Sequence, residues 1–454
     1  MKKFIINLAV FSALTVFSAT FCFAQSKNQT QSEKNDSNKD VQKISVDDAV
    51  ILAADNNISL KSQKIDLDVL EKKDKYSWNS VSPSISLSAG YSDSFVSGSF
   101  TDDGYKSIDT GAGSLSLNGG LSLRFSPSVL ASMKSAKLSY ENGIVTYESA
   151  VRSVELDVRR RFYGLLNSKE NIALLERNME TARIRYENDR DKYSRGQLSE
   201  LDLLNSQYNY EKLKPTIQQT INTYENDVAS FKQILGLDQE QEIELLGSMD
   251  DFIPPQDFSI DVKIDEIPSI KKIESSIEAQ KIALTAARFS AWGPTVSASY
   301  SYSLGGKAEK GAPSSGRDSL SLNVSVPLDG YLPWSSGALS IDSQKSNLEK
   351  LQLQLEESKT TAALSIEKQI KSLRQMNLQI KNLDKNVEIA QKTYDMTLRA
   401  YNAGSRDLLT LQSASDTLMS VRLNRQQQLY SILSAVLDLE NTLGIPFGSL
   451  GDKK

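Results

Sequence analysis

The sequence of 454 residues contains no histidine and one cysteine, Cys22. Without histidine, the chain lacks the side chain that most often acts as a general base near neutral pH and as a transition-metal ligand. Without a second cysteine, it has no internal disulfide. We find no nucleophile motif, phosphate-binding loop or metal-ligand cluster, and acid pairs such as Asp102 and Asp103 are typical of solvated loops. We therefore expect that the protein is not an enzyme and that it has no catalytic residue, no cofactor and no metal.

Long apolar runs are scarce as well. One run covers residues 4–23, behind two lysines and ahead of the small residue Ala24. This order predicts a secretory signal peptide over residues 1–24, with an uncleaved anchor or lipidation of Cys22 as alternatives. Beyond it, no stretch approaches the roughly 20 apolar residues of a membrane-spanning helix.

Positive charge is not in excess. The formal net charge is −5, and removal of the predicted signal, which holds two lysines and no acid, would take it to −7. A mildly acidic exported protein is a poor candidate for nucleic-acid binding. The polar residues 25–43 that follow predict a disordered N-terminal segment, because they have too little apolar surface to form a core.

Four segments alternate apolar residues with small polar ones, which predicts β-strands with one apolar face. They begin at Ile85, Leu115, Val296 and Leu320. Each is about ten residues long, as expected for strands of an outer-membrane barrel. Aromatic residues in or near the strands suit a membrane interface, namely Tyr91, Trp292, Tyr300, Tyr331 and Trp334. The connecting segments Ser97–Ala112 and Gly305–Asp318 are rich in Gly, Ser and charge, and we expect them to be extracellular loops.

Between the strands, apolar residues recur at steps of three, four and seven, which is typical of long helices with a coiled-coil-like seam. Ser45 begins one helix that we expect to continue to Trp78. Two further helices run about 65 residues each, or roughly 100 Å, from the strands to a turn. Pro215 should kink the helix that follows the first of these turns.

The turn itself occurs twice. "YSRGQLSELDLLNSQ" at 193–207 aligns without a gap with "YNAGSRDLLTLQSAS" at 401–415. Gly196 and Gly404 lie where one long helix reverses into the next, and glycine accepts the positive φ of such a reversal. Ser199 and Asp407 each follow three residues later and can N-cap the returning helix.

The whole chain follows this duplication. We predict a first repeat at 44–236, an acidic linker at 237–268, a second repeat at 269–444 and a C-terminal tail at 445–454. Each repeat consists of a helix, two strands and a long helical hairpin.

The strand count predicts an oligomer. Four strands cannot close a barrel, and an open edge is not tolerated in lipid. Three copies would give about twelve strands and an open lumen, whereas two would give about eight with a filled interior. Inward-facing Ser and Gly favour three, and a soluble β-sandwich with helical stalks remains an alternative.

With these features in place, the sequence resembles outer membrane efflux proteins of the TolC family. The resemblance extends from Ser45 to Gly444 and is most specific in "YNAGSRDLLTLQSA" and "LYSILSAVLDLENTLG". It implies a mainly α fold with a β-barrel portion: a homotrimer with a barrel in outer-membrane lipid and a helical barrel in the periplasm. It also implies an exit duct for efflux or type I secretion, joined through a periplasmic adaptor (membrane fusion protein) to an inner-membrane transporter.

The resemblance further implies a gate at the periplasmic turns. In the family pattern, a tyrosine and an arginine of the second repeat bond to neighbouring residues of the turns, one of which is an acid of the first repeat. The matching residues here are Tyr401, Arg406 and Asp202. The family's acidic positions six and nine residues after the second glycine are occupied by Thr410 and Ser413, which leaves ion selectivity open.

Two other classes of protein also contain long helical hairpins or coiled coils. A periplasmic adaptor would need one hairpin and a β-rich module, rather than two hairpins with alternating strands. A trimeric coiled-coil surface stalk or adhesin without transport activity would not need paired helix reversals, and it is the main alternative.

Overall fold

A computed structural model describes residues 42–92, 98–101, 104–107, 113–249, 252, 263–307 and 313–450. The chain divides into Met1–Gln42 and a second unit, Lys43–Lys454, to which the following description applies. The predicted signal peptide, Cys22 and nearly all of the predicted disordered segment lie outside the described residues.

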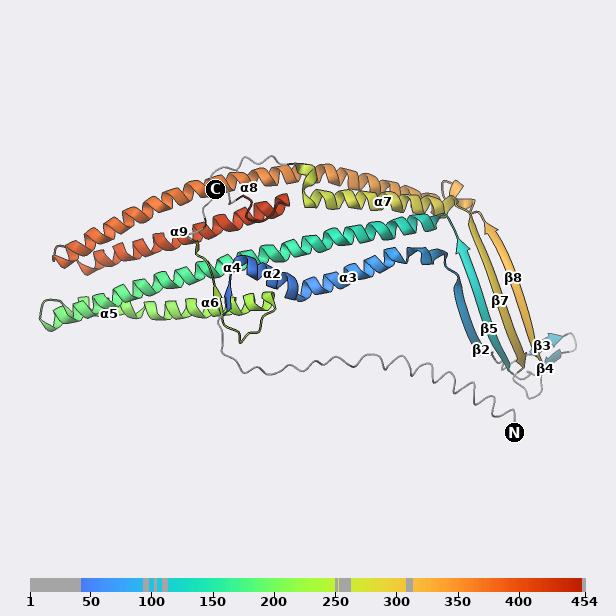
Figure 1. The fold of residues 1–454 in the computed structure, drawn as a ribbon, viewed down its shortest axis with the longest axis horizontal. Helices are drawn as coiled ribbons and strands as arrows, with labels where there is room; N and C mark the ends of the chain where they lie inside the picture. Colours follow the sequence, from blue (N-terminus) through green and yellow to red (C-terminus); the bar gives the residue numbers. More distant parts are fainter. Residues whose placement is uncertain are drawn as a thin grey trace, which may run out of the picture. The chain divides into compact units, whose positions relative to one another are not determined.

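The second unit is built from two similar halves (Figure 1), which confirms the predicted tandem repeat. The first half contains, in order, α3 (Ile58–Lys75), β2 (Ser84–Ser92), β5 (Ser114–Phe125), α4 (Ser128–Ser194), α5 (Glu200–Glu211) and α6 (Leu213–Leu235). The second half contains α7 (Pro268–Trp292), β7 (Thr295–Lys307), β8 (Ser314–Ser325), α8 (Ser336–Asn402) and α9 (Leu408–Leu443).

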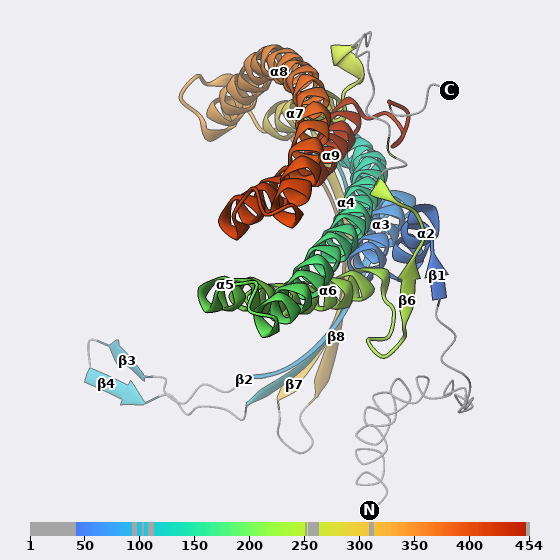
Figure 2. The ribbon, with the colours of Figure 1, turned by 90° about the vertical axis from the view of Figure 1, so that its left-hand side faces the viewer.

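The two longest helices are equal in length. Helices α4 and α8 have 67 residues each, close to the expected 65, and correspond to roughly 100 Å. Seen from the turns (Figure 2), α8 and α9 form one hairpin, while α4 with α5 and α6 forms the other. Each hairpin therefore brings its turn to the end of the unit opposite the strands.

The first predicted helix, from Ser45 toward Trp78, is wrong as a single element. The structure divides it into α2 (Val46–Asn56), α3 and a 3-10 turn at Ser77–Val81. Asn57 adopts an extended backbone, and its side chain accepts hydrogen bonds from the N–H groups of Ser59 and Leu60. Asn57 thus caps a second helix, and this local bond competes with continuation of the first.

The helix around Pro215 is interrupted as expected. Helix α5 ends at Glu211 and α6 begins at Leu213, so the break lies at Lys212. Pro215 has no N–H to donate to the carbonyl of Glu211, and its ring collides with that carbonyl in a regular helix.

The four long strands form one antiparallel sheet in the order β2-β5-β7-β8. In its register, Ser84 pairs with Ser122, Ser122 with Ser299, and Ser299 with Ser321. Small polar residues therefore align across all four strands on one face, because side chains alternate along each strand.

Both predicted loops differ from expectation. β7 continues to Lys307 and β8 begins at Ser314, so much of the predicted loop Gly305–Asp318 is strand. Within the predicted loop Ser97–Ala112, β3 (Gly98–Thr101) and β4 (Gly104–Ser107) form a hairpin. Residues 305–318 are mostly small or charged, so they lack the apolar face that signals a strand in the sequence.

The core lies midway along the helices, where α2, α4, α6 and α9 meet. Its largest fully buried side chains include Phe162, Phe231, Ile432 and Leu439. The predicted acidic linker contributes to this region, because it contains β6 (Ile243–Leu245), which pairs with β1 (Gln42–Ile44), and the buried Met249. These few apolar residues could not be recognised as part of the core, because the segment is otherwise polar.

The residues after α9 fold back onto the same region. Fully buried Glu440 accepts hydrogen bonds from the N–H groups of Gly448 and Leu450 at 2.9 and 2.8 Å. The Arg152 guanidinium donates to the carbonyl of Glu440 at 2.7 Å and lies 4.7 Å from the Phe447 ring centroid. These contacts attach the predicted tail to α4 and α9.

No helix in the described ranges combines the length and the apolar character needed to cross a membrane.

Candidate functional site

The two turns at the ends of the hairpins share one backbone geometry. Gly196 and Gly404 have φ of 71° and 74°, the left-handed region that side chains disfavour. After each glycine, the next N–H donates back five residues, from Gln197 to Lys192 and from Ser405 to Ala400, both at 2.9 Å. This is the Schellman arrangement, which satisfies the last carbonyls of a helix.

The returning helices begin at the two expected residues. The Ser199 hydroxyl accepts from the N–H of Asp202 at 3.1 Å, and the Asp407 carboxylate accepts from the N–H of Thr410 at 3.2 Å. Both are N-caps in extended conformation. The hydrogen bond from the Thr410 side chain also lowers the pKa of Asp407 below its usual range.

Just before the second turn, Tyr401 joins the two hairpins. Its hydroxyl donates to Oδ1 of Asp189 on α4 at 2.8 Å. Asp189 is fully buried, and Lys192 Nζ lies 4.0 Å from its carboxylate and 4.8 Å from the Tyr401 ring centroid. The bond therefore spans from the second hairpin to the first at a site shielded from water.

Burial shapes the protonation of this pair. It raises the pKa of Asp189, an effect opposed by the Tyr401 hydrogen bond and by the charges of Lys192 and Arg185. Burial, followed by the bond to Asp189, also raises the pKa of Tyr401. Tyr401 thus remains a donor near neutral pH, and a buried carboxylate holds its charge at a cost.

A second link joins the hairpins on α5 and α9. The side-chain amides of Asn209 and Gln412 donate to each other's oxygens in a reciprocal pair, and both side chains are part-buried. These residues and Asp189 were not predicted from the sequence. We refer to the Asp189–Tyr401 and Asn209–Gln412 contacts as the two inter-hairpin links.

The expected Arg406–Asp202 pair is not formed within the protomer. Asp202 instead accepts from the Ser199 hydroxyl at 2.6 Å, and Arg406 has no ion-pair partner among the described residues. Asp202 lies near enough for its charge to help raise the pKa of Tyr401. The structure therefore brings Tyr401 and Asp202 into one neighbourhood but gives Tyr401 a different hydrogen-bond partner.

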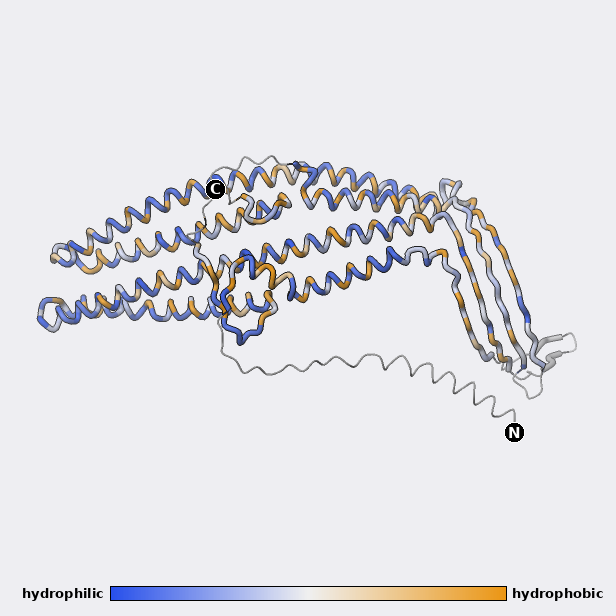
Figure 3. Tube along the Cα trace, viewed as in Figure 1, coloured by the Kyte–Doolittle hydropathy of each residue, from blue (hydrophilic) through white to orange (hydrophobic). Residues whose placement is uncertain are grey.

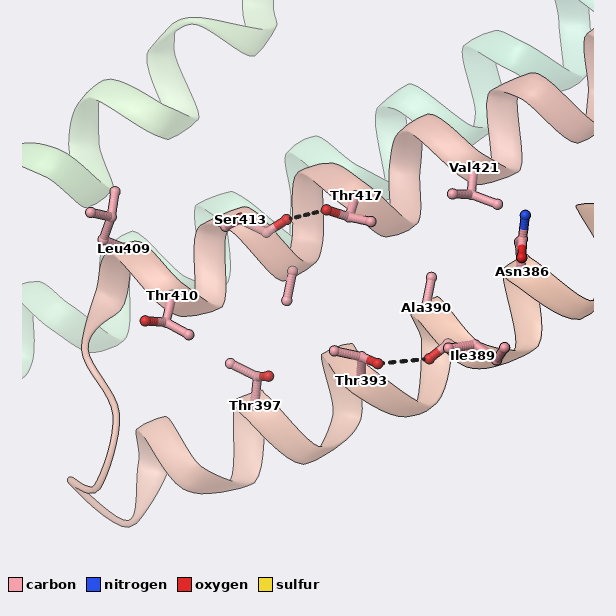
Figure 4. Close-up of a pocket in the computed structure, with 11 residues that line it drawn as sticks. Asn386, Ile389, Ala390, Thr393, Thr397, Leu409, Thr410, Ser413, Thr417 and Val421 are labelled. Carbon is pink, nitrogen blue, oxygen red and sulfur yellow. Dashed lines mark hydrogen bonds between the residues drawn. The ribbon is translucent and has the colours of Figure 1, made fainter.

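A groove of about 690 Å³ lies between α8 and α9 beside the turn (Figure 4). Thr410 and Ser413 lie along it on α9, facing Thr393 and Thr397 on α8. Some of its hydroxyls donate to their own helix, as Thr417 does to the carbonyl of Ser413 at 2.7 Å. The groove is neutral, because the residues that line it carry no charge.

At the opposite end of the unit, the sheet exposes an apolar face. Its alternation is visible along β2, β5 and β8 (Figure 3), and large apolar side chains on it are exposed, including Ile85 at 85% and Leu320 at 80%. Aromatic residues flank the strand ends, where the Trp292 and Tyr331 rings stack at 6.0 Å and Trp334 is exposed. Such a surface in contact with water would be unfavourable, so it indicates a membrane or protein environment.

The sheet is open. Among the described strands, β2 and β8 each have a neighbour on one side only. An unpaired strand edge leaves backbone groups that need a partner, above all in lipid.

In the described ranges, no group of three His, Cys, Asp or Glu side chains is placed to hold an ion.

Two long helical hairpins joined to an exposed apolar sheet are the features of a membrane channel with a helical extension. Comparison with family models identifies the family. The model for outer membrane efflux proteins matches residues 50–237 and 263–445. The chain belongs to this family. No curated protein sequence matches it.

Solved structures of outer membrane channels share the fold. The CmeC outer membrane channel of Campylobacter jejuni is 17% identical, with a TM-score of 0.68 over 93% of this chain and 90% of that one. CusC is 13% identical, with a TM-score of 0.71 over 93% of this chain and all of the other. The MtrE channel of Neisseria gonorrhoeae, solved in its open state, is 16% identical, with a TM-score of 0.68 over 88% and 89%.

Family and fold together place the protein in the outer membrane, with its helical tunnel in the periplasm, as an exit duct for efflux. The surface stalk or adhesin is not favoured. The family is one of conduits rather than of enzymes, and its channels are trimers that work with adaptors and inner-membrane pumps.

Proposed function

We propose that three copies of this chain form a passive duct whose barrel closes by pairing β8 of one protomer with β2 of the next. The open sheet carries this proposal, because its exposed apolar face and its two single-sided edge strands both require a partner. Three sheets of four strands give about twelve strands, enough to enclose a lumen. No bond is made or broken in this function.

Cysteine cross-linking between edge strands tests it. Ser86→Cys in β2 with Ser321→Cys in β8 should give disulfide-linked trimers in the outer-membrane fraction. The control is Ser122→Cys with Ser299→Cys, which pair within one sheet and should stay monomeric on a denaturing gel. Linked species absent over a scan of neighbouring β2 and β8 positions would contradict the barrel.

We also propose that the turns form the periplasmic gate. In the closed state, the two inter-hairpin links hold the second hairpin against the first, and Gly196, Gly404, Ser199 and Asp407 fix the turns themselves. Arg406 and Asp202, which are not paired with each other within the protomer, are available to contact the neighbouring protomer's turns at this end of the tunnel.

Opening of the gate would then require free energy from a binding partner. Each link is a small number of hydrogen bonds, worth about 1–2 kcal/mol apiece, so a docking partner could break it. We propose that a periplasmic adaptor coupled to an inner-membrane transporter supplies that free energy by binding at the turns.

A further inference from the structure

The polar face of the sheet has an unusual composition. Its serines pair across strands, with hydroxyl oxygens 2.6 Å apart for Ser299 and Ser321 and 2.8 Å for Ser301 and Ser319. Ser303 likewise donates to Asn118 at 2.7 Å. With three exceptions, every position that the register of β2, β5, β7 and β8 places on this face is Ser, Thr, Asn or Gly.

The three exceptions are all basic. Arg124 lies at the helix end of β5, while Lys307 and Arg317 lie at the far ends of β7 and β8. All three are exposed, and none has an ion-pair partner among the described residues. Arg124 pairs in register with Ser297, Lys307 with Ser114, and Arg317 with Ser303, so their neighbours are neutral.

The acid of the same strands lies on the other side. Asp318 pairs in register with Tyr302 on the face that carries Leu320 and Leu322. That face is the apolar one, which meets lipid in an outer-membrane barrel, so the serine face lines the lumen. Basic charge inside the lumen is therefore not offset by an acid on any described strand position of the same face.

From this arrangement we infer that the barrel passes anions and uncharged polar solutes in preference to cations. The exported substrates would then be anionic or uncharged. The inference rests on the proposed trimer, in which each basic residue becomes a ring of three around the lumen. Two basic zones result, one at the periplasmic junction and one toward the outside.

The size of the effect follows from simple electrostatics. A unit charge about 10 Å from an ion in water changes that ion's local concentration by roughly twofold before screening. A ring of three charges, screened over a length of about 10 Å at 0.1 M salt, retains an effect of about that size. We therefore expect a chloride-to-potassium permeability ratio of about 2 or more at that salt concentration, falling as salt is raised.

Two other sources of charge lead to the opposite expectation. Asp416 lies on α9 beside Ser413 and Thr417 in a shallow groove near the turns. The segments 93–112 and 308–312 contain acids in the sequence and connect the far ends of the strands. If either dominated, the current would favour potassium.

The test is the reversal potential of purified trimers in planar bilayers under a tenfold potassium chloride gradient. Wild-type channels should prefer chloride, and Arg124→Ser, Lys307→Ser and Arg317→Ser combined should bring the permeability ratio to about 1. Arg317→Glu alone should lower the ratio, which separates loss of charge from any loss of assembly. Asp318→Ser is the matched control: it alters the adjacent residue on the lipid face and should leave selectivity unchanged.

The outcomes are distinct. A potassium-preferring current, or a chloride preference that survives the triple variant, would overturn the inference and leave the duct itself intact. A selectivity that moves with Asp416→Asn but not with the three basic residues would also overturn it. Trimers that never conduct, even when Tyr401→Phe is added to weaken the closed gate, would contradict the proposed duct on which the inference rests.

Discussion

At the scale of single residues, the two repeats use the same tyrosine differently. Tyr193 and Tyr401 occupy equivalent places before their glycines, yet Tyr193 is 41% exposed while Tyr401 is half-buried and bonded to Asp189. The internal repeat thus supplies a natural control for the role of the bond.

Tyr401→Phe removes the hydroxyl that reaches Asp189 and leaves a buried carboxylate without that donor. Such a loss costs about 1–2 kcal/mol, so we expect the closed state to weaken about tenfold in each protomer. Resting conductance in planar bilayers should rise. Tyr193→Phe should leave it unchanged, and equal conductance in the two variants would remove Tyr401 from the gate.

If the turns form the proposed gate, protonation of Asp189 should make its opening depend on pH. Lys192 and Arg185 of α4, Tyr401 of α8 and the buried Ser206 of α5 surround it, and burial raises its pKa in this structure, which we assign to the proposed closed state. If opening exposes Asp189, its pKa falls toward the ordinary value of about 4. The closed state then binds the proton more tightly, so acidification from neutral pH toward about 4 favours closure.

Resting current should therefore fall as the pH is lowered, and Asp189→Asn, which keeps the shape without the titration, should flatten this dependence. A dependence of the same slope in Asp189→Asn would assign it to another group.

Part of this site can be predicted from the sequence. The glycines, both N-caps and Tyr401 follow from the repeated turn. Asp189 did not, although it lies between Tyr186 and Tyr193 at steps of three and four on an otherwise apolar stripe. An acid at such a position must be buried with a partner, and this was the available signal. The Asn209–Gln412 pair had none, because its contact depends on how the hairpins meet.

At the scale of elements, the features that depend on nearby residues could be predicted from the sequence. The long helices, the alternating strands and the break near Pro215 follow from periodicity and from proline's missing N–H. The cap at Asn57 and the extension of β7 and β8 beyond their apolar residues depend on a side-chain hydrogen bond and on pairing with a neighbouring strand. Neither leaves a periodic pattern.

The turn glycines can be tested through their conformation alone. A side chain at Gly196 or Gly404 would meet no atom within 4 Å, so substitution there acts through the positive φ. Alanine should cost about 1–2 kcal/mol in the left-handed region, and the Gln197 and Ser405 amides should exchange hydrogen about tenfold faster. Gly404→Asn should have a smaller effect, since asparagine tolerates this conformation. Amide exchange rates in the alanine variants equal to those of the wild type would contradict the role of the positive φ.

At the scale of the whole unit, the helices are held together unequally along their length. Near the core, α4 and α9 are joined by buried apolar residues, by the Arg160–Asp438 ion pair and by the bond from Gln426 to Glu170 at 2.8 Å. Near the turns, the links between hairpins are individual polar contacts, to which Arg185 adds a bond to Tyr394 at 3.3 Å. Motion of one hairpin tip relative to the other is therefore the least costly rearrangement, and it leaves the core and the sheet in place.

This uneven distribution predicts that opening can be blocked without disturbing assembly. Asn209→Cys with Gln412→Cys, bridged by a short bifunctional thiol reagent, would join α5 to α9 covalently. The bridge should hold resting current low even when Tyr401→Phe is also present, while trimer formation and membrane insertion are unaffected. Gln391→Cys with Arg422→Cys is the matched control, because these residues are hydrogen-bonded within one hairpin, and their bridge should not prevent opening. Full conductance with the Asn209–Gln412 bridge intact would show that the gate opens without separating the hairpins.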